Sequence, residues 1–333
     1  MRNVDEELRA LDPARLTSHE GSTQASAQLG AILSTGRTVP KGQPPRPRRW
    51  ILASAGVATA MTALIVVVDP FSTTSQPAYA MTPEPLRYEH STRSAGEALE
   101  EIAQRIEGIR DNRPAAWSSE HFVTEGWSLS TSIDGTQVTS AVIPEHRETW
   151  EKADGSSQWT ARTLRPQFQN EEQRKTWENA GSVGKDPKTW SDSSEPSKTS
   201  NAEPPSTPGG MKEWLAAGHA SLSPDLAFEV IPERFRDHVF SPAQRAALLR
   251  VLKETEGIVY EGTVEDRAKR TGEAFSLTTD SSGLPNKRTL VFDSSTGDLF
   301  AYEEELTTDA GKLNVKAPAV IDYTTFLTAE RIA

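Results

Sequence analysis

One long apolar run stands out from a chain that otherwise mixes apolar and polar positions, and it covers Trp50–Val68. From Ile51 to Val68 it contains neither a charged residue nor proline. At about 1.5 Å per residue, a helix of this length spans roughly the 27–30 Å of a bilayer core. Three basic residues precede it directly: Arg46, Arg48 and Arg49. The positive-inside rule therefore predicts a single membrane helix, bounded by Trp50, Ile51 and Val68, with a cytoplasmic N-terminus.

A secretory signal peptide is the alternative interpretation of the same run. Ala78-Tyr79-Ala80 has the small-x-small form of a cleavage site. However, the run is longer than the usual apolar core of about 7–15 residues, and a polar stretch separates it from these alanines. The length favours an uncleaved anchor in the cell membrane. Under either interpretation the C-terminal part lies outside the cytoplasm.

The run divides the chain into parts of different composition. Residues 1–49 form a cytoplasmic tail that we expect to be largely disordered, since 35–49 is rich in proline and arginine. The membrane helix covers 50–68 and a linker covers 69–80. Residues 81–333 form the extracytoplasmic domain. Within it, the segment 166–210 is rich in Ser, Pro, Lys and Glu, which predicts a flexible polar insertion.

Apolar spacing in the domain predicts strands, then helices, then strands. Ser94 and Glu97 have capping-box spacing ahead of a helical pattern. Alternating residues predict a meander over 122–133, 136–150 and 158–164, with Asp134-Gly135 as the first turn. Helical patterns follow at 211–219, 224–231 and after Ser241, and five more strand-length runs lie at 258–264, 273–279, 287–293, 299–306 and 319–326. The order predicts an α+β fold, a curved antiparallel sheet packed by helices.

Charge is distributed unevenly between the two sides of the membrane helix. The whole chain has a net charge of -11, with 36 Lys and Arg against 47 Asp and Glu. Residues 1–49 carry eight of the basic and five of the acidic residues, which gives +3, so the part after the helix carries -14. An acidic exported domain argues against nucleic acid as a partner. The chain has no cysteine, which excludes disulfides, thiol catalysis and Cys-based metal sites.

Motifs for catalysis or metal binding are missing from the sequence. The six histidines lie in no metal-ligand spacing: His19, His90, His121, His146, His219 and His238. Neither G-x-S-x-G nor a phosphate-binding glycine loop occurs. We therefore expect no catalytic residue, no metal site and no cofactor, and hence a protein that is not an enzyme.

Acidic and aromatic positions on the predicted strands allow two interpretations each. Glu303 and Glu305 share one face of a strand, where they could attract a cation, although a solvated strand face is the simpler expectation. Glu265-Asp266-Arg267 could form a local ion pair. Three strand tryptophans are expected to be core or cross-strand residues, with a sugar-stacking platform as the alternative: Trp127, Trp150 and Trp159. Trp177 and Trp190 are expected to pin the polar insertion to the domain, with exposed contacts to a partner or glycan as the alternative.

Several phrases of the sequence, in this order, resemble a family of actinobacterial single-pass membrane proteins of unknown function, often noted beside genes for sigma factors. They are AMTPEPLRY (80–88), EGWSLST (125–131), AVIPEHRETWEKADGS (141–156), SPAQRAALLRVLKETEGIVYEGTVEDRAKRTGEAF (241–275) and LVFDSSTGDLFAYEEEL (290–306). The resemblance implies a basic cytoplasmic tail, one membrane helix and an exported α+β domain, with no catalytic residues to transfer. The tail here departs from a zinc-binding anti-sigma domain, since it has no His/Cys motif.

These features together predict a membrane-anchored, non-enzymatic interaction or sensor protein with links to envelope or sigma-factor signalling. Its expected partners are the lipid bilayer, through the helix, and a protein at the cell envelope; the sequence leaves the oligomeric state open. A lipid- or lipoprotein-binding carrier-like domain is the second hypothesis, because an open sheet packed by helices can leave an apolar groove. An envelope hydrolase is the third.

Overall fold

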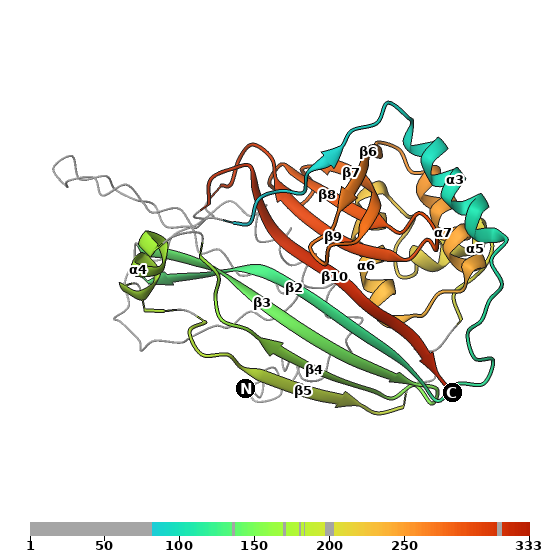
Figure 1. The fold of residues 1–333 in the computed structure, drawn as a ribbon, viewed down its shortest axis with the longest axis horizontal. Helices are drawn as coiled ribbons and strands as arrows, with labels where there is room; N and C mark the ends of the chain where they lie inside the picture. The colour runs from blue at the N-terminus through green and yellow to red at the C-terminus, as the bar shows by residue number, and fades with distance from the viewer. Residues whose placement is uncertain are drawn as a thin grey trace, which may run out of the picture. The chain divides into compact units, whose positions relative to one another are not determined.

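The described part of the chain folds around one antiparallel sheet of ten strands, with helices on one of its faces (Figure 1). This description comes from a computed structural model of the chain. The structure describes residues 82–134, 137–168, 171–179, 181–182, 184–196, 203–311 and 315–333. All of them belong to one structural unit that spans Thr74–Ala333. The predicted α+β class with an antiparallel sheet is confirmed.

The sheet combines two meanders that are distant in sequence. Along the chain the strands are β1 (Tyr88–Glu89), β2 (Ser119–Asp134), β3 (Gln137–Lys152), β4 (Ser157–Thr163), β5 (Thr189–Ser194), β6 (Val259–Glu265), β7 (Thr271–Thr279), β8 (Asn286–Phe292), β9 (Leu299–Leu306) and β10 (Ala319–Ile332). Their order in the sheet is β1-β6-β7-β8-β9-β10-β2-β3-β4-β5. The last strand of the C-terminal meander, β10, therefore pairs with the first strand of the N-terminal meander, β2.

The described helices are α3 (Ala95–Glu107), α4 (Glu171–Asn179), α5 (Pro208–Leu215), α6 (Pro224–Asp237) and α7 (Pro242–Lys253). Helices α3, α6 and α7 begin where the sequence predicts, whereas α5 begins three residues before the predicted Met211, and α4 lies in the segment predicted to be a flexible insertion. Ser94 with Glu97, and Ser241 with Gln244, form complete capping boxes. Helix α6 continues past the predicted end at Ile231, through Pro232, because Phe235 in its last turn is buried in the core. This burial outweighs the backbone hydrogen bond that proline removes.

The main core lies between the sheet and helices α3, α5, α6 and α7, which gather beside the C-terminal strands in Figure 1. Phe228 of α6 packs in one apolar cluster with Phe275 of β7 and Phe292 of β8, and none of these side chains reaches solvent. We call this side of the sheet the helix face and the opposite side the outer face. Alternate residues of the same strands, such as Ala274 and Val291, belong to a second apolar cluster on the outer face.

The segment that leads into β1 lies across the outer face. Leu86 and Tyr88 pack against the second apolar cluster, and the backbone N–H of Leu86 donates to Glu303 Oε1 at 3.3 Å. Arg267 binds Glu303 Oε2 at 2.7 Å and also the carbonyl oxygen of Glu84 at 3.0 Å. This segment therefore joins the sheet through side chains and backbone together.

The expected solvated face of Glu303 and Glu305 is wrong, because both side chains are buried. Burial raises the pKa of Glu303, although the guanidinium of Arg267 opposes this. The expected local ion pair is also replaced by others, since Asp266 binds Arg270 and Glu265 binds Lys269. The position of Glu303 and Glu305 on one face of the strand was predicted correctly, but the residues that cover this face, such as Leu86 and Arg267, were not.

No described helix is long and apolar enough to cross a membrane. The predicted anchor residues Trp50, Ile51 and Val68, and the topology-determining Arg46, Arg48 and Arg49, lie outside the described residues, as do the tail 1–49 and the linker 69–80. Within the predicted insertion 166–210 the structure describes α4 and β5, which pairs with β4, as well as the start of α5. Trp177 of α4 is buried and packs on Phe168, which belongs to the same segment. Trp190 lies on β5, where its pairing with Ala161 of β4 connects the segment to the sheet.

Candidate functional site

The three strand tryptophans take three different roles. Trp127 is buried in the apolar cluster of the outer face. Trp159 lies under the guanidinium of Arg147 at 4.6 Å, on the helix face by its register with Thr149. Trp150 is half-buried on the outer face, where its ring stacks on His121. Trp150 and Trp159 are both half-buried, and Trp150 is distinguished by the ring of His121 that stacks on it.

Strand register places Trp150 in a row of side chains that crosses the outer face. His121 of β2 is directly opposite Trp150 of β3, and Gln158 of β4 is opposite Trp150 on its other side. The imidazole and indole rings are 3.9 Å apart and inclined by 17°, so they form a stacked pair. Cross-strand neighbours are close enough for such contacts. One face of the indole is thus covered by His121.

Two carboxylates hold the imidazole of His121 in place. Its Nε2 lies 2.8 Å from Glu148 of β3, and its Nδ1 lies 3.5 Å from Glu330 of β10. The ring is therefore fixed by three neighbouring strands before any ligand arrives. We call the residues His121, Glu148, Trp150 and Gln158 the Trp150 platform.

A depression of about 360 Å³ lies beside the indole ring. It is lined by Ser119, Glu148, Trp150, Lys152, Gln158, Trp159 and Thr160. The lining combines an aromatic ring with amide, hydroxyl and charged groups from β2, β3 and β4. Such a mixture orients a small ligand through hydrogen bonds while the ring supplies apolar contact.

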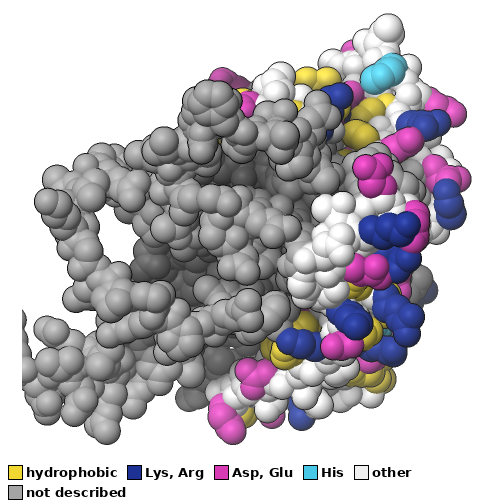
Figure 2. All heavy atoms as spheres, turned by 90° about the vertical axis from the view of Figure 1, so that its left-hand side faces the viewer, with side chains coloured by type: hydrophobic (Ala, Val, Ile, Leu, Met, Phe, Trp, Pro, Cys, Tyr) yellow, Lys and Arg dark blue, Asp and Glu magenta, His cyan; other side chains and the backbone are white. Residues whose placement is uncertain are grey.

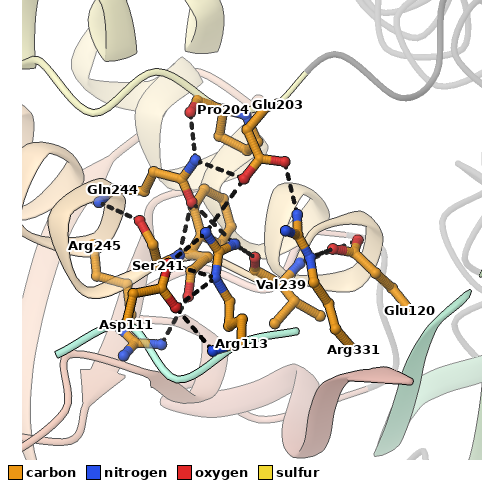
Figure 3. Close-up of polar contacts among 11 residues, drawn as sticks. Asp111, Arg113, Glu120, Glu203, Pro204, Val239, Ser241, Gln244, Arg245 and Arg331 are labelled. Carbon is orange, nitrogen blue, oxygen red and sulfur yellow. Dashed lines mark hydrogen bonds and ion pairs between the residues drawn. The ribbon is translucent and has the colours of Figure 1, made fainter. Parts of the chain in front are cut away.

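A buried polar network supports the platform from the helix face. Adjacent residues of a strand point to opposite faces, so Glu120 and Arg331 lie behind His121 and Glu330. Arg331 Nε donates to Glu120 Oε1 at 2.6 Å, and Glu120 Oε2 accepts the N–H of Val239 at 3.3 Å. Figure 3 shows Glu120 and Arg331 side by side in this network. The ends of β2 and β10 are thereby tied to the turn between α6 and α7.

Glu203 joins the network from the segment before α5. Its carboxylate accepts from Arg331 at 2.7 Å, from Arg113 at 3.3 Å and from Gln244 Nε2 at 3.2 Å (Figure 3). Burial alone would raise the pKa of Glu203, but these hydrogen bonds and the positive charge of Arg331 outweigh it and hold the pKa below its usual value. Arg113 also donates to the carbonyl oxygen of Val239 at 2.5 Å. Four distant segments therefore meet at this point.

Glu151 provides a test of the electrostatics beside the network. It is directly opposite Glu120, and burial raises its pKa to about 7, helped by the negative charges of Asp237 and Glu120. Because the folded pKa exceeds the ordinary value of 4.5, the folded state binds the proton more tightly, and stability falls as pH rises from about 4.5 through 7.

We expect Glu151→Gln to be about 1–2 kcal/mol more stable than the wild type near pH 8 and equal to it near pH 4, after allowance for the solvent that reaches this half-buried side chain. Urea-induced unfolding of the full-length protein at the two pH values measures this difference. The exposed Glu148→Gln substitution would be a poor control because it removes a platform contact, so Glu125→Gln on β2 serves instead. A gain in stability for Glu151→Gln that is the same at both pH values would contradict the raised pKa of Glu151 as its cause.

Other candidate residues from the sequence are dispersed. His121 belongs to the platform, whereas His146 pairs with Glu125 and His90 lies near Glu261. Among the described residues, no group of three or more His, Asp or Glu side chains is arranged to hold a metal ion. The platform was visible in the sequence only as a tryptophan in a strand pattern. Its partner His121 and the network behind it depend on strand register, which the sequence left undefined.

The surface at the α4 end of the domain carries charges of both signs. On its described part in Figure 2, Lys and Arg side chains alternate with Asp and Glu, and hydrophobic side chains show only in small areas.

Comparison with known proteins adds no relative. No protein-family model matches the chain, and no curated protein matches it. The family resemblance given above on short phrases therefore stays a prediction.

Proposed function

We propose that the protein is a membrane-anchored, extracytoplasmic, non-enzymatic interaction or sensor protein that binds its ligand at the Trp150 platform. In this proposal a single helix over 50–68 tethers a curved antiparallel sheet to the outer side of the cell membrane. A link to envelope or sigma-factor signalling rests on the family resemblance alone.

The observation that carries the proposal is the pre-organised state of the platform. His121 is held between Glu148 and Glu330, and it fixes the indole of Trp150 from one side. The strands beneath are tied down by the Arg331–Glu120 pair. A rigid aromatic surface binds with little loss of conformational entropy. This arrangement suits recognition, and it presents no activated nucleophile for a reaction.

The packing of the helix face favours this function over a lipid carrier. A carrier would need an apolar groove between the sheet and the helices. In the part of the chain that the structure describes, that space holds the side chains of Phe228, Phe235 and Phe292, all buried in one cluster. The aromatic rings of Phe235 and Phe292 are 6.4 Å apart, in edge contact.

The segment before β1 gives the proposed domain a firm connection to its tether. Leu86 and Tyr88 are packed on the outer face, and Glu84 is held by Arg267. In this proposal, the ligand binds to the outer face of the same sheet that the segment before β1 connects to the membrane helix.

Thiol labelling tests the proposal, since the natural chain contains no cysteine. Ser119→Cys places one thiol at the wall of the depression without removing a platform residue, Ser281→Cys places one on an exposed turn, and Ser22→Cys places one in the tail. We expect a membrane-impermeant maleimide to label positions 119 and 281 on intact cells, and position 22 only after permeabilisation. If a ligand occupies the platform, position 119 reacts several times more slowly in cells than in the purified full-length protein.

Position 281 is the matched control, because its reaction rate should be the same in cells and after purification. Labelling of position 119 only after permeabilisation would reject the topology. Equal rates at position 119 in both settings would reject an occupied platform, and with it the interaction role.

A further inference from the structure

We propose that the ligand of the Trp150 platform is a neutral saccharide, bound with the C–H face of one pyranose ring against the indole of Trp150. This inference rests on the function proposed above and names the chemical class of the ligand. A pyranose presents an apolar C–H face and a rim of hydroxyl groups, and the depression offers a partner for each.

The apolar partner is the indole of Trp150. His121 stacks on one face of this ring, and the depression is lined by the indole together with residues of β2, β3 and β4. The indole is thus one wall of the depression, and the stacked imidazole holds it in place. A volume of about 360 Å³ accommodates one or two pyranose rings. Flat apolar contact of this kind is what aromatic side chains contribute to binding.

The polar partners are positioned for the hydroxyl rim. The side chains of Gln158 and Thr160 make no hydrogen bond with any described residue, and both line the depression. Glu148 uses Oε1 for His121, so its second carboxylate oxygen can accept from a hydroxyl. An amide, a hydroxyl and a carboxylate provide both donors and acceptors, as hydroxyl groups require.

Other ligands with an aromatic or apolar face fit the surroundings less well. A nucleotide would bring phosphate close to Glu148, on a part of the chain whose net charge is -14, where Lys152 is the one cationic side chain of the lining. A peptide that adds a strand needs a free sheet edge, but β3 pairs with β2 and β4, and β4 pairs with β3 and β5. A neutral saccharide needs neither a cationic site nor an edge.

The test is a titration of the full-length protein in mild detergent with maltose, cellobiose and N,N′-diacetylchitobiose, followed by ligand-observed NMR. We expect at least one of these probes to bind, and Trp150→Ala to weaken it by about tenfold or more. Trp150→Phe should retain part of the affinity because it keeps an aromatic wall. Trp190→Ala is the matched control, since Trp190 is a half-buried strand tryptophan on the helix face, away from the depression.

Two results would overturn the saccharide proposal: no binding of any probe to the wild type, or equal binding by Trp150→Ala with an unchanged near-ultraviolet circular dichroism spectrum. The thiol at position 119 separates this failure from that of the interaction role. Slow labelling in cells together with absence of saccharide binding would keep the role and reject the ligand class. Equal labelling rates in cells and after purification would reject both.

Discussion

Replacing Arg270 with methionine will lower the free energy of unfolding by about 3–5 kcal/mol, one of the largest effects expected for a single substitution in this protein. Arg270 binds the carboxylate of Asp266 through Nε at 2.9 Å and through a terminal nitrogen at 2.6 Å. The Asp266 side chain has no exposed surface. The substitution leaves this carboxylate buried without its cation, and water cannot replace the lost contacts.

Arg270 also connects strands that are not neighbours of its own turn. It donates to the carbonyl oxygens of Phe326 in β10 at 2.7 Å and Phe300 in β9 at 2.8 Å. Its guanidinium lies 4.1 Å from the centre of the Phe300 ring. One side chain therefore ties the turn between β6 and β7 to two strands of the sheet.

Lys269→Met is the matched control for Arg270→Met, because Lys269 is adjacent and pairs with Glu265 at the same spacing. Its side chain is 79% exposed, so its removal should change stability by less than about 0.5 kcal/mol. Urea-induced unfolding of both full-length variants, followed by tryptophan fluorescence, gives the comparison. Similar losses for the two variants would show that the Asp266 pair is not what stabilises this turn.

Strands and helices were predicted from the sequence more successfully than contacts between distant segments. Strand and helix positions followed from local patterns, since capping boxes at Ser94 and Ser241 and two-residue alternation depend only on neighbours in the chain. Strands β2 to β4 and β6 to β10 were visible in this way, whereas β5 was not, because it lies in the segment predicted to be a flexible insertion. The pairing of β10 with β2 was not, because it joins segments separated by almost two hundred residues and leaves no local signal.

The same limit applies to the candidate site. Trp150 was recognisable as a strand residue, but its role depends on His121 from β2, Glu330 from β10 and Gln158 from β4. Strands β2, β3 and β4 already meet in the N-terminal meander, whereas Glu330 of β10 reaches His121 only after the two meanders join. The burial of Glu303 was missed for the same reason, since the cover over it comes from Leu86 and Arg267.

The join between β10 and β2 carries the second large effect. Arg331→Met should lower the free energy of unfolding by about 3 kcal/mol, because Glu120 is then buried without its cation. Only 9% of the Arg331 side chain and 5% of the Glu120 side chain are exposed. Arg331 also holds Glu203 at 2.7 Å and lies 5.1 Å from the ring of Trp117.

A double-mutant cycle separates the pair from these other contacts. Glu120→Gln combined with Arg331→Met removes both charges, so we expect the double variant to recover much of the loss, with a coupling energy of about 2 kcal/mol. Urea-induced unfolding of the two single variants and the double variant provides the cycle. Additive losses would mean that Arg331 acts mainly through Glu203 and Trp117.

The pH dependence of Arg331→Met adds a readout that loss of packing alone would not change. Burial already raises the pKa of Glu120, although Arg331 and the N–H of Val239 oppose it. Without Arg331 the pKa rises further, so near pH 4 the carboxyl is neutral in both folded and unfolded states and costs little to bury. The loss of stability should therefore be largest near pH 8 and shrink towards pH 4.

The Glu120–Arg331 pair also bears on the Trp150 platform, because these two residues alternate with His121 and Glu330 along β2 and β10. The pair would therefore determine the rigidity of the platform as well as the stability of the sheet. A loss that is constant with pH would assign Arg331 to packing and leave the platform without this support.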